Sequence, residues 1–415
     1  SGMKIHLGLE GVHSVITFLF AGRDALNCCT NRDQEKILKM NYLYAACLLL
    51  LYVSFTVADE NEKPTFCSKD KAKCELAGIN VTCVTNPDCT KYVADNNASL
   101  TLAAADDLVK NEDKLQIVYG QKLPGLDKFV QYYGLAVVEK NSTIKLTELN
   151  GKKSCHTGVD KTVGWKIPVG YLLYTKKMTF TDNQYTSAAD FFNESCAPGA
   201  DKKNVSQRVK DDLCKLCNGT CDDNSVYAGY TGAFKCMAAG TNDRVGFVKQ
   251  DTASAVFKDY PGQYGNSSDY KLLCKNGTTS ELDSYKSCYI AKRPLYALVT
   301  SKETPSAMVT KWQNMLNSTN LTDLKKGGIV SDNAESLQLY SGSVENYVGD
   351  YGKYFNALFG PGKPNSTNTP SPTNTPSPTN TPSPTNTPST TNSAPSSFMS
   401  FALQAVAILA FVILI

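Results

Sequence analysis

The stretch at residues 151–168, GKKSCHTGVDKTVGWKIP, carries the clearest signal in the chain. Small and hydroxyl residues lead here into an apolar run of helical character. The first N–H groups of a helix have no partner within the helix, so they can bind an anion. Thr157 adds a hydroxyl donor and Lys161 adds a positive charge. Taken alone, the pattern still favours an ordinary capped helix over an anion site.

A second stretch, at residues 227–236, has the sequence YAGYTGAFKC, and GFVK follows at residues 246–249. Gly229 and Gly232 flank Tyr230, which allows close backbone approach and leaves the phenol accessible. An isolated tyrosine is more often a buried ring with one satisfied hydroxyl group. Tyr230 therefore indicates a functional site only in combination with residues 151–168.

Together, these stretches resemble the signature of the transferrin family, in particular of a single transferrin lobe. The resemblance extends from about Cys67 to about Leu339. It implies an α/β lobe at residues 59–360, rich in disulfides, in which two subdomains like those of periplasmic binding proteins close over a cleft. One subdomain would be discontinuous, at about residues 59–130 with 295–360. The other would be continuous, at about residues 131–294.

The residue pattern by itself also favours an α/β fold. Short apolar runs at residues 135–138 and 244–248 are typical of buried strands. Helix-like stretches at residues 188–193 and 308–316 alternate with them, as in α/β proteins.

Overall composition narrows the class of protein further. The chain has 415 residues, 42% of them hydrophobic, and a formal net charge of +3. No long basic run dominates the sequence, so no nucleic-acid partner is expected. The ordinary hydrophobic content excludes global disorder and a polytopic membrane protein.

The N-terminal region has the pattern of a secretory signal. An apolar run begins after Met40, and small residues precede the charged stretch that starts at Asp59. We expect a signal peptide at residues 40–58, cleaved near Ala58. Residues 1–39 would then be a leader that is not translated, or the start of translation would be misplaced. The alternative is a type II membrane anchor, for which the run is short.

The C-terminal region has the pattern of a lipid anchor. Residues 361–392 are rich in Pro, Ser and Thr and predict an extended, O-glycosylated stalk. Residues 398–415 are almost entirely apolar and lack a basic flank. This pattern favours a GPI-attachment signal at residues 393–415, with Asn392 as the attachment site, over a C-terminal transmembrane helix. Ser389 and Ser393 are the alternative attachment sites. The expected location is the extracellular face of the plasma membrane.

The cysteines and sequons fit a secreted protein. Of the fifteen cysteines, Cys28, Cys29 and Cys47 lie in the segments that processing would remove, which leaves an even number. The resemblance implies the pairs Cys67–Cys89, Cys74–Cys83, Cys155–Cys236, Cys196–Cys217, Cys214–Cys221 and Cys274–Cys288. Glycosylation sequons occur at Asn80, Asn97, Asn141, Asn193, Asn204, Asn218, Asn266, Asn276, Asn317, Asn320 and Asn365.

The resemblance also implies a ligand set. Family members hold Fe3+ with one Asp, two Tyr and one His, and hold carbonate with a Thr and an Arg. The two tyrosines fall on Tyr132 and Tyr230, the threonine falls on Thr157, and the backbone donors to carbonate (or bicarbonate) fall on Val163 and Gly164. Phenolate oxygens suit this hard ion, and acid favours release because the phenol must lose its proton to bind.

Three positions depart from the family pattern. The family arginine falls on Lys161. Lysine keeps the positive charge but lacks the planar guanidinium group, which can donate two parallel hydrogen bonds to carbonate. The histidine falls on Tyr296, either a third phenolate ligand or a residue that fills space. A small insertion would bring Asp106 to the aspartate position; direct alignment puts an alanine there, and Asp107 is the third alternative.

Two functions follow from these residues. The first is cell-surface binding of ferric iron with carbonate, for iron uptake or iron handling, with a surface reductase or receptor as a further partner. The second is a surface glycoprotein that has lost tight iron binding and acts in adhesion, signalling or ligand capture. We do not expect an enzyme, because His6 and His13 lie in the leader and His156 alone builds no catalytic constellation.

Overall fold

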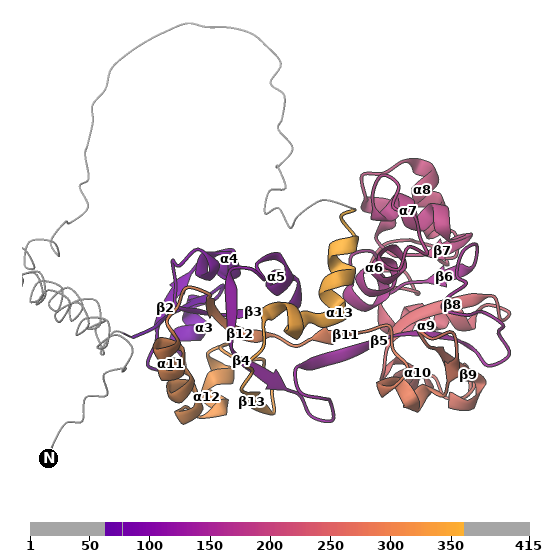
Figure 1. Ribbon diagram of the computed structural model, residues 1–415. Coiled ribbons are helices and arrows are strands. Elements are labelled where there is room, and N and C mark those ends of the chain that lie inside the picture. Colours follow the sequence, from indigo (N-terminus) through magenta and orange to yellow (C-terminus); the bar gives the residue numbers. More distant parts are fainter. Residues whose placement is uncertain (1–62, 77, 361–415) are drawn as a thin grey trace, which may run out of the picture. The chain divides into compact units, whose positions relative to one another are not determined.

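The computed structural model describes residues 63–76 and 78–360 (Figure 1). The predicted leader, signal peptide, stalk and GPI signal, together with Asn365 and Asn392, lie outside the described residues. Within those residues, no helix is long and apolar enough to cross a membrane.

The first sheet has six strands in the order β13-β4-β12-β3-β1-β2. Three strands near one edge run parallel, while β12 is antiparallel to both β3 and β4. The strands are β1 (Thr65–Ser68), β2 (Thr82–Thr85), β3 (Leu100–Ala103), β4 (Leu115–Lys122), β12 (Ala297–Ser301) and β13 (Ser336–Gln338). The helices of this part are α3 (Lys71–Glu75), α4 (Cys89–Ala94), α5 (Ala105–Lys110), α11 (Ser306–Ser318) and α12 (Leu321–Lys326).

The second sheet has seven strands, with β10-β9-β5-β8-β6-β7 in line and β11 paired to β5. Its strands are β5 (Val130–Glu139), β6 (Lys153–Cys155), β7 (Glu194–Cys196), β8 (Arg244–Lys249), β9 (Tyr270–Leu273), β10 (Thr279–Ser280) and β11 (Ala291–Pro294). Its helices are the π-helix η1 (Thr162–Lys166), α6 (Ile167–Tyr174), α7 (Gln184–Phe191), α8 (Gln207–Cys214), α9 (Gly229–Ala238) and α10 (Thr252–Asp259), with short 3₁₀ turns at η2 (Ala200–Lys202), η3 (Ser267–Asp269) and η4 (Leu282–Lys286).

The chain passes between the two sheets twice, next to the predicted subdomain boundaries. It leaves the first sheet after β4 to form β5, and it returns from β11 to β12. The last described helix, α13 (Val344–Ala357), packs on both α5 and α6. At Gly170 of α6, an added Cβ atom would lie 2.2 Å from the Tyr354 carbonyl oxygen, so only glycine allows this approach. Helix α13 therefore links the two parts of the fold.

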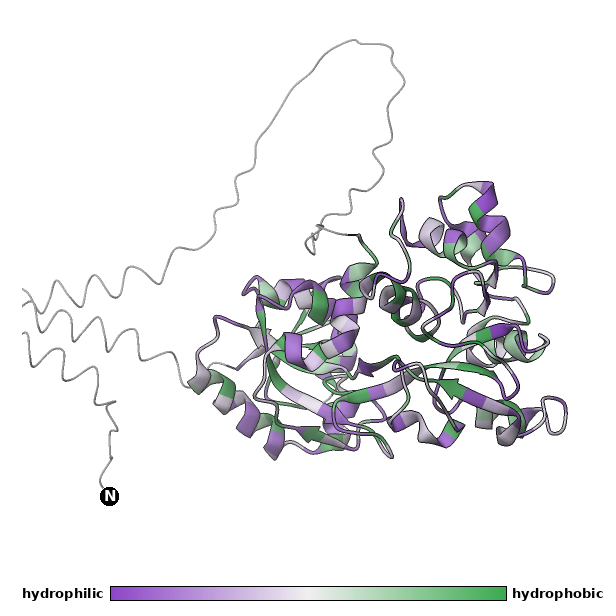
Figure 2. Cartoon of the chain, turned by 45° about the vertical axis from the view of Figure 1, so that its right-hand side comes forward, coloured by the Kyte–Doolittle hydropathy of each residue, from purple (hydrophilic) through white to green (hydrophobic). Residues whose placement is uncertain are grey.

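Apolar side chains of the strands and helices form the cores. Figure 2 colours each residue of these elements by its hydropathy. The apolar runs expected at residues 135–138 and 244–248 lie in β5 and β8, where nearly all of their side chains are buried. The helix expected at residues 188–193 ends earlier, at Phe191. The helix ends there because the chain begins to pair with the region of β6: the Asn193 N–H donates to the Lys152 carbonyl oxygen instead of to the helix.

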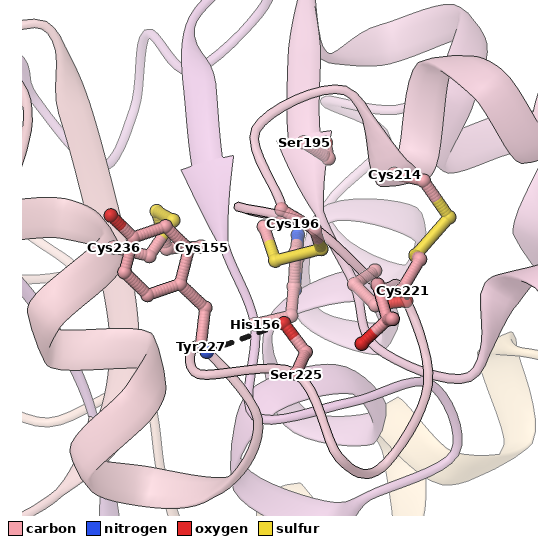
Figure 3. Close-up of a disulfide and its surroundings, with 12 residues drawn as sticks. Cys155, His156, Ser195, Cys196, Cys214, Cys221, Ser225, Tyr227 and Cys236 are labelled. Carbon is pink, nitrogen blue, oxygen red and sulfur yellow. Dashed lines mark hydrogen bonds between the residues drawn. A yellow bond between two sulfur atoms is a disulfide. The ribbon is translucent and has the colours of Figure 1, made fainter.

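Six disulfides connect twelve cysteines, in the pairs that the family resemblance implied. The bond between Cys155 and Cys236 joins β6 to α9, two elements on which the candidate site is built (Figure 3). The ten sequon asparagines within the described residues are all exposed. Glycosylation at them stays a prediction.

Candidate metal and anion site

Strand β5 and helix α9 bring Tyr132 and Tyr230 together. The Tyr132 phenol lies close enough to the Tyr230 phenol and to the Thr162 side chain to interact with both. Burial raises the pKa of both tyrosines above the ordinary value, although the charge of Arg293 opposes this at each of them. Both are therefore phenols at neutral pH, and a metal must displace their protons to bind.

The position of Tyr230 depends on the first turn of α9. Gly229 has a positive φ of 74°, and its N–H donates to the Thr157 carbonyl oxygen at 3.0 Å. An added Cβ atom at Gly232 would lie 2.2 Å from the Tyr227 carbonyl carbon, so the helix can pack here only with glycine. These contacts fix Tyr230 beside the loop that carries Thr157.

That loop leads from β6 into η1 and α6, which form one continuous helical segment. Thr157 is 5% exposed, and its Oγ1 atom lacks a hydrogen-bond partner among the described residues. An added Cβ atom at Gly164 would lie only 2.2 Å from this Oγ1 atom. The start of the helix is thus packed tightly against an unsatisfied buried hydroxyl group, an arrangement that suits a small anion.

The other residues predicted to bind the anion lie at the beginning of η1. Val163 and Gly164 are buried in its first turn, where helical N–H groups have no partner within the helix. Lys161 is the residue before the helix, and its side chain is exposed. Its charge therefore acts through solvent, which weakens it as a substitute for a buried arginine fork.

His156 is a structural residue of the same loop. Its Nδ1 atom lies 2.6 Å from the Gly164 carbonyl oxygen, and its Nε2 atom lies 2.9 Å from Ser154 Oγ. A carbonyl can only accept, so Nδ1 carries the proton and Nε2 accepts from Ser154. Burial lowers the pKa of His156 to about 4, which keeps the ring neutral. Ser195 lies next to Ser154 at 2.7 Å in this interior (Figure 3).

The acidic candidate Asp106 is already engaged. It lies in the first turn of α5, forms an ion pair with Lys166 at the end of η1, and accepts a hydrogen bond from Tyr351 of α13. Burial would raise the pKa of Asp106, but the charge and hydrogen bond of Lys166 and the bond from Tyr351 lower it overall. We call Asp106, Lys166 and Tyr351 the clasp, because it joins α5, η1 and α13.

The other two alternatives for the aspartate are placed as follows. Ala103 is buried at the end of β3, directly after Thr101 and Leu102, in regular register with β12. Asp107 pairs with Lys110 on its own helix at 3.8 Å, and burial raises the pKa of Asp107. Which carboxylate, if any, reaches a metal stays a prediction.

Tyr296 lies between β11 and β12, half-buried, with its carbonyl oxygen accepting from the Gln121 side chain at 2.9 Å. Its ring lies 5.6 Å from the guanidinium carbon of Arg293, and the Tyr132 ring lies 5.5 Å from the same atom. Arg293 was missed by sequence reasoning. The only sequence signal was an arginine within a short run that the structure shows as a mostly buried strand; its position opposite Tyr132 is known from the structure alone.

Within residues 63–76 and 78–360, no group of three or more His, Cys, Asp or Glu residues could hold a metal ion. The oxygen-rich cluster described above is built instead around phenols, a threonine hydroxyl group and a helix start. Those groups suit a hard trivalent cation with an accompanying anion.

Comparison with known proteins agrees with this two-sheet lobe. The sequence model of the family described as Transferrin matches residues 54–345, which is more than half of the chain. The chain therefore belongs to the transferrin family, a family of iron-binding proteins, as its sequence motifs predicted.

Individual members of the transferrin family also match this chain. Serotransferrin of Equus caballus is 37% identical over 225 residues, covering 51% of this chain and 30% of the relative. Melanotransferrin of Homo sapiens is 36% identical over 196 residues, covering 44% of this chain and 26% of the relative. The crystal structure of transferrin 1 from Manduca sexta superimposes with a TM-score of 0.55 at 21% identity, over 71% of this chain and 52% of that one, which supports the fold. The matches to these two curated relatives span about a third or less of their length.

Proposed function

We propose that this protein binds ferric iron together with carbonate, and that it does so on the surface of the cell. The observation that carries the proposal is the contact between the Tyr132 and Tyr230 phenols beside the unpartnered Thr157 hydroxyl group. Two phenolates and a bound anion would supply hard oxygen ligands, which ferric iron prefers.

Each residue has a separate part in this proposal. Tyr132 and Tyr230 bind Fe3+ as phenolates, while Thr157 Oγ1 and the N–H groups of Val163 and Gly164 hold carbonate or bicarbonate. Lys161 adds a positive charge from the solvent side. Because both phenols must lose protons to bind, acid favours release of the iron. Tyr296 and Asp106 are the candidates for the remaining coordination positions.

We further propose that the protein is delivered by the signal peptide and held by a GPI lipid above the membrane. The support is the sequence pattern of the two ends, together with the exposure of every described sequon asparagine. The role would be iron uptake or iron handling by the cell that displays the protein, with a surface reductase or receptor as partner.

Visible spectroscopy tests iron binding directly. Adding Fe3+ with bicarbonate to the purified protein should produce a tyrosinate-to-iron absorption band, and Tyr230→Phe should abolish most of it. Tyr174→Phe is the matched control, because this tyrosine is 50% exposed and lies outside the cluster. Absence of a band in the wild-type protein, or an unchanged band in Tyr230→Phe, would refute the assignment.

The second candidate is a surface glycoprotein of the same fold that has lost tight iron binding. It is favoured by the clasp, which occupies Asp106, and by the positive charge of Arg293 beside Tyr132. Thermal unfolding separates the two candidates, because a ligand that binds only the folded state raises its stability by mass action. A binder should melt at a higher temperature with iron and bicarbonate, and a non-binder should not.

A further inference from the structure

Arg293 is a buried cation, and two of its three guanidinium nitrogen atoms lack a hydrogen-bond partner among the described residues. It lies in β11 and is 9% exposed. Its Nε and Nη1 atoms lack hydrogen-bond partners among the described residues. A buried guanidinium that keeps free N–H groups is costly, so such groups in folded proteins usually have an acceptor.

The neighbours of Arg293 cannot supply that acceptor. Because β11 pairs with β5, Arg293 lies directly opposite Tyr132, and its guanidinium carbon lies 5.5 Å from that ring and 5.6 Å from the ring of Tyr296. Ring faces attract a cation but do not satisfy its N–H groups. Its charge also interacts through space with the Asp106 carboxylate.

The carboxylate of Asp106 is committed elsewhere. One oxygen atom pairs with Lys166, and the other accepts the hydrogen bond of Tyr351. With Asp106 held in the clasp, Arg293 has no ion-pair partner within residues 63–76 and 78–360 and lies in a cluster of phenols. Free guanidinium N–H groups in such a place fit the oxygens of a small oxyanion, which form charge-assisted hydrogen bonds with them.

We propose that Arg293 binds a small oxyanion of the carbonate, carboxylate or phosphate class between Tyr132 and Tyr296. Arg293 is not among the anion-binding positions that the family resemblance supplies, which are Thr157, Lys161, Val163 and Gly164. The site forms in the metal-free protein, so the inference does not rest on iron binding.

Titration of the metal-free full-length protein tests this site. Bicarbonate, oxalate and phosphate are added separately, and binding is followed by isothermal calorimetry and by the near-ultraviolet difference spectrum of tyrosine, since two tyrosine rings contact the guanidinium group. We expect saturable binding of at least one of the three anions. Arg293→Gln should weaken it by about tenfold or more, and Arg293→Lys should retain part of it.

Matched variants decide which cation binds the anion. Lys161→Gln removes the exposed cation of the anion loop, and we expect it to weaken binding less than Arg293→Gln does. Equal binding by wild type and Arg293→Gln, a loss of all binding in Lys161→Gln alone, or no saturable binding of any of the three anions would overturn the proposal.

Stability gives a second measurement that does not depend on detecting the anion complex. Arg293→Met removes a buried charge with unsatisfied N–H groups, so the metal-free, anion-free variant should melt at the same or a higher temperature than wild type. Addition of the anion should raise the melting temperature of wild type but not of Arg293→Met. An equal rise in both proteins would contradict the assignment. Iron binding can fail while these results hold, and the reverse, so the two proposals are separable.

Discussion

The two sides of the candidate site satisfy their polar groups in opposite ways. On the tyrosine side, formed by Tyr132, Tyr230 and Thr157, the groups bond to one another or stay unpartnered. On the other side, the clasp engages both oxygens of Asp106. Hence Thr157 can bond to a ligand without breaking a contact and the two tyrosines must lose their protons, whereas Asp106 must first give up an ion pair and a hydrogen bond.

The largest expected effect concerns the tyrosine side itself. Tyr132→Phe removes the phenol that lies between Thr162 and Tyr230, and we expect loss of most of the visible iron band, as for Tyr230→Phe. The two variants should be equally defective if both phenols bind one metal. A band of half intensity in each would show that the tyrosines bind separate metals, and the comparison between the two sides would then fail.

Acid should weaken the two sides in different pH ranges. The pKa of His156 falls from 6.5 to about 4 on folding, so the unfolded chain takes up this proton first and stability falls as the pH is lowered from 6.5 to 4. The loss should amount to about 3 kcal/mol for the metal-free protein. Burial tends to raise the pKa of Asp106, but Lys166 and Tyr351 lower it below 3.8, so the contribution of the clasp is lost only at still lower pH.

Urea unfolding between pH 7 and pH 3 measures this separation. His156→Gln should be less stable at pH 7, and its stability should depend less on pH between 6.5 and 4. A wild-type protein with constant stability through that window would contradict the assignment of His156 as the buried neutral group that anchors the loop.

Releasing Asp106 tests whether the clasp competes with a metal. Lys166→Met breaks an ion pair whose side chains are only 20% and 24% exposed, which should cost about 1–2 kcal/mol of stability. The freed carboxylate should then raise iron affinity by up to about tenfold, while Asp106→Asn should not. Lys326→Met is the control, because it breaks an exposed ion pair with Asp323 on α12, and Asp323 is not a candidate ligand. If Lys166→Met and Asp106→Asn both lower affinity equally, Asp106 acts only through the clasp.

The smallest expected effect concerns Lys161. Lys161→Arg restores a planar fork at the start of η1, so half-maximal formation of the iron band should need about threefold to tenfold less bicarbonate. Lys152→Arg changes an exposed lysine directly before β6 and should leave the bicarbonate requirement unchanged. An equal shift in both variants would point to a general charge effect.

Local motifs made much of this arrangement predictable. The cysteines, Thr157 and Tyr230 lie in contiguous stretches whose residue types are set by a tight turn, a helix start or a disulfide. The clasp was not predictable, because Asp106 meets Lys166 across 60 residues and Tyr351 across 245. Arg293 was missed for a related reason, since its partners are rings contributed by a neighbouring strand and a later turn, and strand register is not visible in the motif.

The disulfide between Cys155 and Cys236 ties the chemistry of the site to the redox state of its surroundings. Cys155 precedes Thr157 by two residues, and Cys236 belongs to the helix that carries Tyr230, so one covalent bond connects the elements that hold the candidate anion-binding and metal-binding residues. It closes a loop of 81 residues, which in the chain-entropy model contributes about 4–5 kcal/mol to stability. Reduction of this bond should therefore loosen the Thr157 loop and the helix that carries Tyr230 relative to each other.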